Sequence, residues 1–149
     1  MNRINRKLEY ALMALRYMSR KIPGQLTTAK EVTDALRTPF DATSRVMQIM
    51  AQRGILRSEQ GAMGGYMIIR DLAKVSLLEL IECIEGRPSV ARCVSDEDSC
   101  EIRPSCNIVA PVIALNQRIQ NFYASITLKE LLFDQDVRST ASPRSELRL

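Results

Sequence analysis

Three of the four cysteines in this chain lie close together in the segment CVSDEDSCEIRPSC, as Cys93, Cys100 and Cys106, with six and then five residues between them. The chain contains no histidine. In a reducing compartment, clustered cysteines more often bind metals or undergo redox chemistry than form structural disulfides. The spacing therefore predicts a metal-binding or redox segment in an acidic loop, and it leaves open which residue completes a ligand set.

The composition favours one globular unit in the cytoplasm. The sequence has 149 residues, of which 46% are apolar, and this is enough for a packed core. The first 21 residues carry charge on both sides of their apolar positions, so they resemble neither a signal peptide nor a membrane span. We therefore expect a cytoplasmic protein that does not enter a membrane.

Charge is distributed unevenly along the chain. Residues 1–75 contain 13 Lys and Arg against 6 Asp and Glu, a net charge of +7, whereas residues 76–133 contain 5 against 8, a net charge of −3. A basic first half indicates a module that binds a polyanion such as nucleic acid, joined to a part with a different task. A mildly basic solvated surface would give the same count, so charge alone leaves both interpretations open.

The first half has the pattern of a winged helix-turn-helix domain. Apolar residues at helical spacing predict three helices in the first 54 residues, and the second of them begins at a capping box, Thr28–Glu31. The third helix takes Asp41 as its N-cap and closes at Gly54, because glycine adopts the left-handed conformation readily. Two short strands around the glycine-rich turn of residues 61–65 predict a β-hairpin, which completes a DNA-binding domain over residues 1–75.

The predicted DNA contacts lie on the third helix and the hairpin. The first turn of that helix, with one residue a turn later, is expected to face outward and to meet base edges in a major groove, where Arg pairs with guanine and Gln with adenine. The start of the second helix suits a phosphate, and the glycines of the wing allow close approach to the DNA backbone or a minor groove. Exposed polar residues without DNA contact are the alternative for each position. The candidate contacts are Thr28, Thr43, Ser44, Arg45, Gln48, Arg57, Gln60, Gly61, Gly64 and Gly65.

A second region, residues 76–133, contains the cysteine loop and a long helix. Beyond Cys106, apolar residues recur at intervals of four and three, which is typical of a helix that pairs with another helix. We expect this seam to form a homodimer interface, because paired helix-turn-helix subunits bind palindromic half-sites; an intramolecular core is the alternative. Residues 134–149, rich in charge, Ser and Pro, are expected to be a disordered tail. The seam consists of Ile108, Val112, Leu115, Ile119, Phe122 and Ile126.

The order of these features resembles a known family. The helix-turn-helix, the wing GAMGGYMIIRD, the three-cysteine loop and the long helix leading into FYASITLKELL are similar to the Rrf family of dimeric winged-helix transcription regulators, over about residues 1–133. IscR-like and NsrR-like members of that family carry iron-sulfur clusters. The resemblance implies a homodimeric regulator, a repressor that binds a palindromic operator in double-stranded DNA and responds to redox state, nitric oxide or iron-sulfur status.

The resemblance also implies ligands for a cluster of two or four irons. The three clustered cysteines would hold it, although their first interval has six residues where the family usually has five. The histidine ligand of IscR-like members is replaced by Val109, which cannot bind iron. NsrR-like members place a carboxylate from the partner protomer at the position of Glu9, so Glu9 is the candidate fourth ligand. Cys83, interpreted as a small buried side chain, is the reserve candidate.

Other functions remain open at this stage. The thiols would also suit a zinc site or redox sensing without a cluster, and a winged-helix regulator can be controlled by a small ligand or a partner protein. Zinc sites usually show paired C-x-x-C elements, which are absent here. A cysteine-based enzyme is disfavoured, because the chain has no histidine for general-base chemistry and no phosphate-binding glycine loop. We expect a DNA-binding regulator and not an enzyme.

Overall fold

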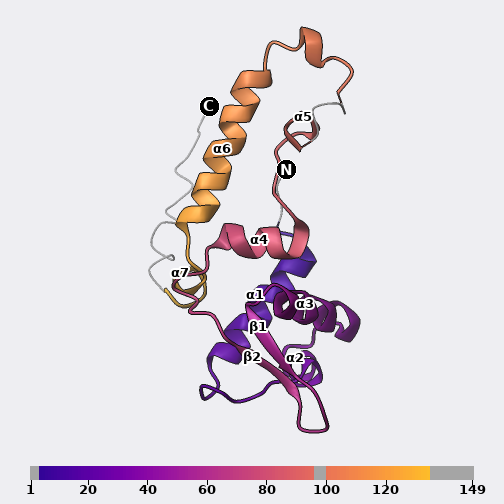
Figure 1. Cartoon of the computed structure of the whole chain (residues 1–149), viewed down its shortest axis with the longest axis vertical. Coiled ribbons are helices and arrows are strands. Elements are labelled where there is room, and N and C mark those ends of the chain that lie inside the picture. Colours follow the sequence, from indigo (N-terminus) through magenta and orange to yellow (C-terminus); the bar gives the residue numbers. More distant parts are fainter. Residues whose placement is uncertain (1–3, 96–99, 135–149) are drawn as a thin grey trace, which may run out of the picture.

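A computed structural model describes residues 4–95 and 100–134. The chain is mainly helical with one antiparallel two-stranded hairpin, arranged as the winged helix-turn-helix that the sequence predicts (Figure 1). The hairpin and the first three helices form one end of the molecule, and α6 extends away from them as a long arm (Figure 1). The elements are α1 (Arg6–Ser19), α2 (Ala29–Leu36), α3 (Phe40–Gln52), β1 (Leu56–Glu59), β2 (Gly65–Ile68), α4 (Leu77–Glu85), α5 (Arg92–Ser95), the 3-10 turn η2 (Arg103–Ser105), α6 (Val109–Ser125) and α7 (Leu128–Phe133).

One apolar core connects both halves of the chain. Leu15 of α1 packs with Val46 and Met50 of α3, and all three side chains are fully buried. The same cluster continues through Leu80 of α4 and Leu128 of α7. Residues three and four apart share one face of a helix, and for this reason the apolar spacing predicts the buried faces of α1 and α3. This core contains residues from both sides of position 75 and so does not mark the domain boundary predicted there. That boundary stays a prediction.

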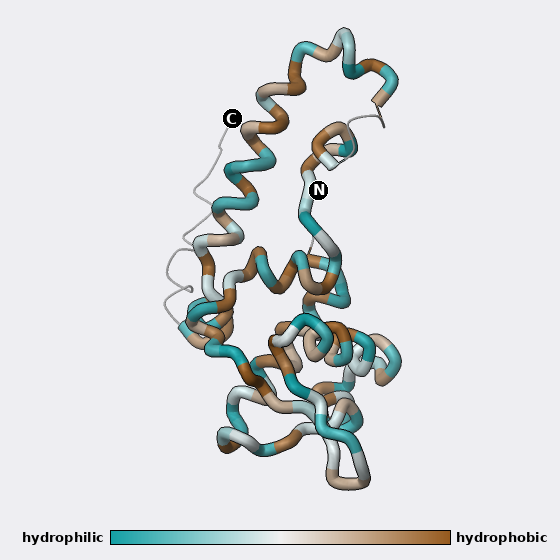
Figure 2. Tube along the Cα trace, in the orientation of Figure 1, coloured by the Kyte–Doolittle hydropathy of each residue, from teal (hydrophilic) through white to brown (hydrophobic). Residues whose placement is uncertain are grey.

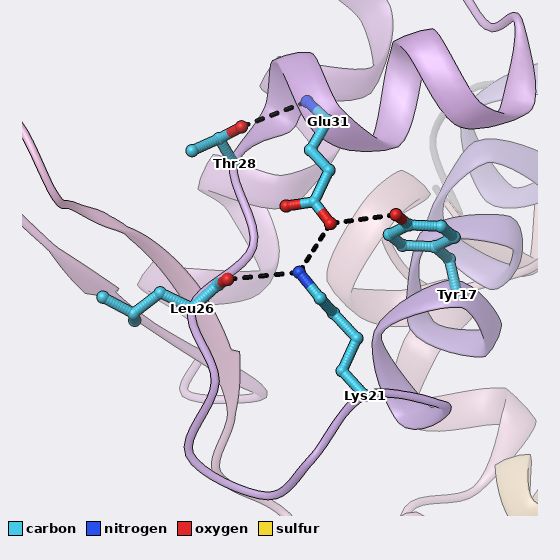
Figure 3. Close-up of polar contacts among 5 residues, drawn as sticks. All are labelled: Tyr17, Lys21, Leu26, Thr28 and Glu31. Atoms are coloured by element: carbon cyan, nitrogen blue, oxygen red, sulfur yellow. Dashed lines mark hydrogen bonds and ion pairs between the residues drawn. The ribbon is translucent and has the colours of Figure 1, made fainter.

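The start of α2 confirms its predicted capping box. Thr28 Oγ1 accepts a hydrogen bond from the backbone amide of Glu31 at 3.0 Å. The Glu31 carboxylate interacts in return with the Thr28 backbone, and it also binds Lys21 and Tyr17 (Figure 3). The carboxylate thus combines its capping contact with contacts to the end of α1.

The start of α3 differs from the prediction. The helix begins at Phe40, with Pro39 as its N-cap and without a side-chain hydrogen bond, so the prediction that Asp41 caps it is wrong. Proline suits this place because its fixed φ leads into a helix and its missing amide needs no partner. Asp41 lies in the first turn, where a negative charge is still favourable. The end of the helix is as predicted, with Gly54 at φ 76°.

The hairpin packs back onto the segment that leads into α2. β1 and β2 pair from Leu56 opposite Ile68 to Glu59 opposite Gly65. Thr27 and Tyr66 exchange two backbone hydrogen bonds, of 2.9 and 2.8 Å. A Cβ atom added at Gly65 would lie 3.0 Å from the Thr27 backbone, and its φ of 154° is unfavourable for other residues. The wing is thus attached directly to the helix-turn-helix.

The arm α6 buries a polar face and leaves much of its apolar seam open. Asn116 and Gln120 are its buried residues. Of the predicted seam, Ile108, Leu115 and Phe122 are exposed in the single chain, whereas the other three members are half-buried. Figure 2 shows hydrophilic and hydrophobic residues interleaved along this helix. An intramolecular core covers the seam only in part, since Ile126 packs against the core while Ile108, Leu115 and Phe122 are exposed, and the role of the seam as a dimer interface stays a prediction.

Two further predictions concern the C-terminal tail and the membrane. The predicted disordered tail, residues 134–149, lies outside the described residues except for Asp134. In the part of the chain that is described, no helix has both the length and the apolar character required to cross a membrane.

Candidate nucleic-acid interface and cysteine segment

The outward face of α3 carries two of the predicted base-contacting residues. The side chains of Arg45 and Gln48 are exposed, and Ser44 is half-buried with its hydroxyl donating to the Asp41 carbonyl at 3.3 Å. Thr43 does not face outward: it is fully buried, and its hydroxyl donates to Thr38 Oγ1 at 2.8 Å. The inclusion of Thr43 among the DNA contacts is therefore wrong for this structure. It lies three residues before Val46, on the apolar face of the helix.

A polar hollow joins α3 to the wing. It has a volume of about 390 Å³ and brings Gln48 of α3 beside Gln60 of the wing, twelve positions apart in sequence. Sequence reasoning did not identify three further polar residues that line it, Gln52, Ser58 and Tyr66. Gln52 follows Gln48 by one helical turn, and this spacing could have revealed it. Hydroxyl and amide groups of this kind suit a DNA backbone or base edge.

The wing presents few charges to a partner. Arg57 Nε pairs with Glu59 Oε1 at 3.2 Å, and Arg57 Nη2 lies 3.2 Å from the sulfur of Met67, so this predicted DNA contact is already bound within the wing. The turn between the strands contains Gly61 and Gly64, both predicted contacts, and ends at β2. Met63 in this turn is 90% exposed, and it too was absent from the prediction. Met side chains of minor-groove proteins can insert between bases, so Met63 belongs to the candidate interface.

The start of α2 is fixed by a charged network behind the interface. Lys21 Nζ donates to Glu31 Oε1 at 2.6 Å and to the Leu26 carbonyl at 3.2 Å, and the Tyr17 hydroxyl donates to the same carboxylate oxygen at 2.9 Å (Figure 3). The hydrogen bond from Lys21 lowers the pKa of Glu31, and the hydrogen bond to Glu31 raises the pKa of Tyr17. Thr28, a predicted phosphate contact, is exposed beside this network with its oxygen already accepting from an amide.

The cysteine segment lies between α4 and the arm. Cys93 is on α5, Cys100 precedes η2 and Cys106 follows η2; all three thiols are free and half-buried. Arg103 Nη1 donates to the Cys93 carbonyl at 2.7 Å and so connects the two ends of the segment. Within residues 4–95 and 100–134, no three His, Cys, Asp or Glu side chains converge on a point where a metal ion would bind.

The two further candidate ligands lie in helices. Cys83 of α4 is half-buried against the apolar core, and burial raises the pKa of its thiol, which disfavours the thiolate that binds metals. Glu9 lies in the first turn of α1 and pairs with Arg6 at 2.9 Å. Its half-buried side chain is open enough to meet a partner protomer.

An exposed Arg and Gln on the second helix of a helix-turn-helix pair, beside a glycine-rich wing, define a winged helix-turn-helix transcription regulator. Residues 4–134 match the Rrf2 family, described as an iron-dependent transcriptional regulator, and the chain belongs to this family. It is thus a DNA-binding regulator and not an enzyme, as the sequence predicts.

Several relatives illustrate the breadth of the similarity. The HTH-type transcriptional regulator NsrR of Shouchella clausii is 19% identical over 129 residues, which are 86% of this chain and 87% of NsrR. IscR of Xenorhabdus nematophila is 30% identical over 92 residues, 62% of this chain and 56% of IscR. The structure of CymR (YrzC), the global cysteine regulator of B. subtilis, has a TM-score of 0.65 at 20% identity, over 89% of this chain and 97% of CymR. The last similarity establishes the shared fold.

The residues present fit an iron-sulfur cluster by chemical type. Three free thiols on one segment are the donors that such clusters use, and none of them is occupied by a disulfide. The described residues of one chain do not gather these thiols at a single point.

Proposed function

We propose that this chain is a homodimeric repressor that binds a palindromic operator in the cytoplasm. The observation that carries the DNA-binding part is the pair of exposed side chains on α3, Arg45 and Gln48, of which Gln48 lines the hollow between α3 and the wing. The exposed apolar residues of α6 support pairing of two arms, because a face of this kind is favourable once covered. Two paired subunits would place two copies of α3 on successive half-sites.

The proposed signal enters through the cysteine segment. Cys93, Cys100 and Cys106 would hold an iron-sulfur cluster, with Glu9 of the partner protomer as the fourth ligand. When bound, such a cluster supplies an iron with one weak oxygen ligand that is open to nitric oxide or oxygen. The members of the family named NsrR and IscR support this proposal.

Contacts within the chain provide a route from the cysteine segment to the DNA-binding helices. The segment is joined to α4 at one end and to α6 at the other. α4 packs against both α1 and α3, and α6 packs against α4. A rearrangement of the segment would therefore shift α4 and α6 together and bias the distance between the two α3 helices of a dimer.

Replacing Arg45 with Ala tests the DNA-binding part. Loss of a bidentate base contact typically costs about 1–3 kcal/mol, so we expect operator affinity to fall by roughly 5- to 150-fold, with relaxed preference at one base pair. Gel-shift titration at fixed salt measures this. Arg53→Ala is the matched control, because Arg53 is exposed at the other end of α3 and has the same charge. Equal affinities of Arg45→Ala and wild type for the operator would contradict the assignment.

Anaerobic purification tests the cluster. We expect brown protein with visible absorption and iron and sulfide in a fixed ratio, and colourless protein for Cys106→Ser, because the ligand set would lose one of its three thiolates. Glu9→Ala should keep iron but alter the spectrum and speed the loss of iron on exposure to oxygen or nitric oxide. Colourless, iron-free wild-type protein prepared with ample iron and sulfide would refute the cluster and leave the DNA-binding result untouched.

A regulator without a cluster is the second candidate. Its support is the lack of convergent metal ligands among the described residues and the fold shared with CymR, a regulator named for cysteine. In that case the free thiols would respond to oxidation, zinc or a partner. Stoichiometric zinc, or reversible oxidation of the cysteines that changes operator affinity in colourless protein, would favour this candidate.

A further inference from the structure

The buried face of α6 contains two carboxamides. Asn116 and Gln120 lie four residues apart, one helical turn, and are only 7% and 6% exposed. Every other buried polar side chain among the described residues is a threonine. Burying an amide is unfavourable unless its hydrogen bonds are made, so these two side chains need specific partners.

Both amides bind the backbone of the connector between α4 and α5. Asn116 Oδ1 accepts from the Val90 amide at 3.0 Å, and Gln120 Nε2 donates to the Pro88 carbonyl at 2.9 Å. Arg87 Nη2 lies 3.5 Å from Gln120 Oε1 and completes the partners of that amide. We call Asn116 and Gln120 the amide clamp.

The helix that bears Cys93 follows directly from the clamped connector. α5 packs against α6, and Val94 and Ser95 face Ile113 across a hollow of about 360 Å³ that the clamp residues also line. In Figure 1 the connector and α5 run beside the arm. The backbone on both sides of Cys93 is therefore fixed: towards α6 by the clamp, and towards η2 by the hydrogen bond from Arg103.

Hydrogen bonds to a backbone fix position more sharply than apolar contacts do. Apolar side chains tolerate sliding because their attraction has no direction, whereas a carboxamide binds its partner only over a narrow range of distance and angle. Two such bonds, one turn apart on α6 and two residues apart on the connector, determine the register between the connector and the arm. Apart from Arg87, whose guanidinium lies 3.5 Å from Gln120 Oε1, the connector takes part in this register through its main chain.

We propose that Asn116 and Gln120 are positioning residues that hold the Cys93-bearing helix in register on α6 and so couple the cysteine segment to the arm. The inference rests on the proposed function for its consequence, since the clamped segment is the proposed sensory site. Its geometry is independent of any bound group. The clamp predicts that Cys93 becomes more accessible when one amide is lost, even in protein that carries no cluster.

The accessibility of Cys93 is measured by the rate of thiol alkylation in cluster-free, full-length protein. Iodoacetamide incorporation at each of the four cysteines is followed over time by peptide mass spectrometry under anaerobic, reducing conditions. Asn116→Leu removes the acceptor of the Val90 amide at similar volume, and we expect alkylation of Cys93 to rise by about tenfold, because loss of one buried hydrogen-bond partner shifts a local opening equilibrium by about that factor. Alkylation of Cys83, which packs on the core, should stay at the wild-type rate.

Three variants separate the clamp from a general loss of stability. Asn116→Asp keeps the accepting oxygen and should retain the wild-type rate at Cys93. Asn121→Leu makes the same change at an exposed position of α6 and should have no effect. Gln120→Glu removes the donor to Pro88 while keeping the side-chain shape, and it should also raise the alkylation rate of Cys93. This variant tests the proposal if Asn116→Leu does not fold. Equal Cys93 rates in Asn116→Leu, Gln120→Glu and wild type would overturn the proposal, as would a parallel rise at Cys83.

A second measurement separates this inference from the cluster proposal. Wild type and Asn116→Leu are reconstituted with iron and sulfide, and the visible absorption is followed after a chelator is added. Faster decay in the variant is expected if both proposals hold. Colourless protein in both cases would refute the cluster, whereas the alkylation result would still decide the clamp.

Discussion

Glu31 stabilises two helices. Its backbone amide begins α2 by donating to Thr28, and its side chain binds Lys21 and Tyr17 near the end of α1 (Figure 3). The Lys21 ammonium also donates to the Leu26 carbonyl, so the loop between the two helices is held at both ends. This network orients the first helix of the DNA-binding pair without using any predicted base contact.

Replacing Glu31 with Gln should make stability less dependent on pH. The Lys21 hydrogen bond lowers the pKa of Glu31 in the folded chain, so the resulting stability is present above the unfolded value, 4.5, and is lost as the pH falls through the lower folded pKa. Because the Glu31 side chain is 38% exposed, solvent screening limits the expected effect to about 0.5–1 kcal/mol at neutral pH. Urea denaturation of both proteins between neutral and acidic pH measures it. A difference that does not shrink in acid would argue against the ion pair.

At the scale of elements, backbone hydrogen bonds help to hold the wing on the helix-turn-helix, in addition to the packing of Leu56 in the core. Thr27 and Tyr66 exchange their main-chain hydrogen bonds at the position where Gly65 leaves no room for a side chain. These two bonds fix the position of the wing relative to the helix-turn-helix, because β2 cannot move away from Thr27 without breaking both of them. The wing and α3 should therefore act on DNA as one rigid surface.

Gly65→Ala should detach the wing from this contact. The new methyl group would lie 3.0 Å from the Thr27 carbonyl in an unfavourable backbone conformation, and the combined strain is expected to cost about 1–3 kcal/mol of stability. Gly61→Ala is the control, since Gly61 also has a positive φ but open space around it, and it should cost less. Thermal denaturation and amide exchange at Tyr66 measure the two effects. Equal losses in both variants would mean that conformation, and not the Thr27 contact, requires glycine at position 65.

The sequence predicts most of these elements but not their side-chain partners. Helical spacing and caps identify the buried faces of α1 and α3, because local geometry alone decides which residues share a face. Asp41 and Thr43 were misassigned because the turn before α3 is closed by Pro39, and because polarity does not reveal that a threonine can be satisfied inside the core by Thr38. The clamp was missed for a related reason: Asn116 and Gln120 look like solvent-facing residues until a distant backbone is packed on them.

At the scale of the whole molecule, the arm determines how two chains would meet. Leu115 is 50% exposed in the single chain and lies at the middle of the predicted seam. Asn116 and Gln120 on the same helix have a different role, because they bind the connector of their own chain. One helix therefore serves both the fold of the protomer and the proposed pairing of protomers.

Leu115→Asp tests the pairing. A carboxylate buried in the seam without a partner is strongly unfavourable, so we expect the dimer to dissociate at least about 100-fold more readily and operator affinity to fall with it. The protomer should keep its melting behaviour, because the position is exposed in the single chain. Gln117→Asp, on the same helix but outside the seam, should leave the association unchanged. Sedimentation equilibrium across a concentration series measures both, and an undissociated Leu115→Asp dimer would rule out this seam.

The clamp restricts the kinds of motion that the arm can make. Asn116 and Gln120 grip a main chain from one side of the cylinder, so spinning the helix about its own axis by even a fraction of a turn would tear both bonds away. A tilt in which α6 and the connector move together would leave both bonds intact. We therefore expect α6 to respond to a change at the cysteine segment by tilting and not by rotating about its own axis.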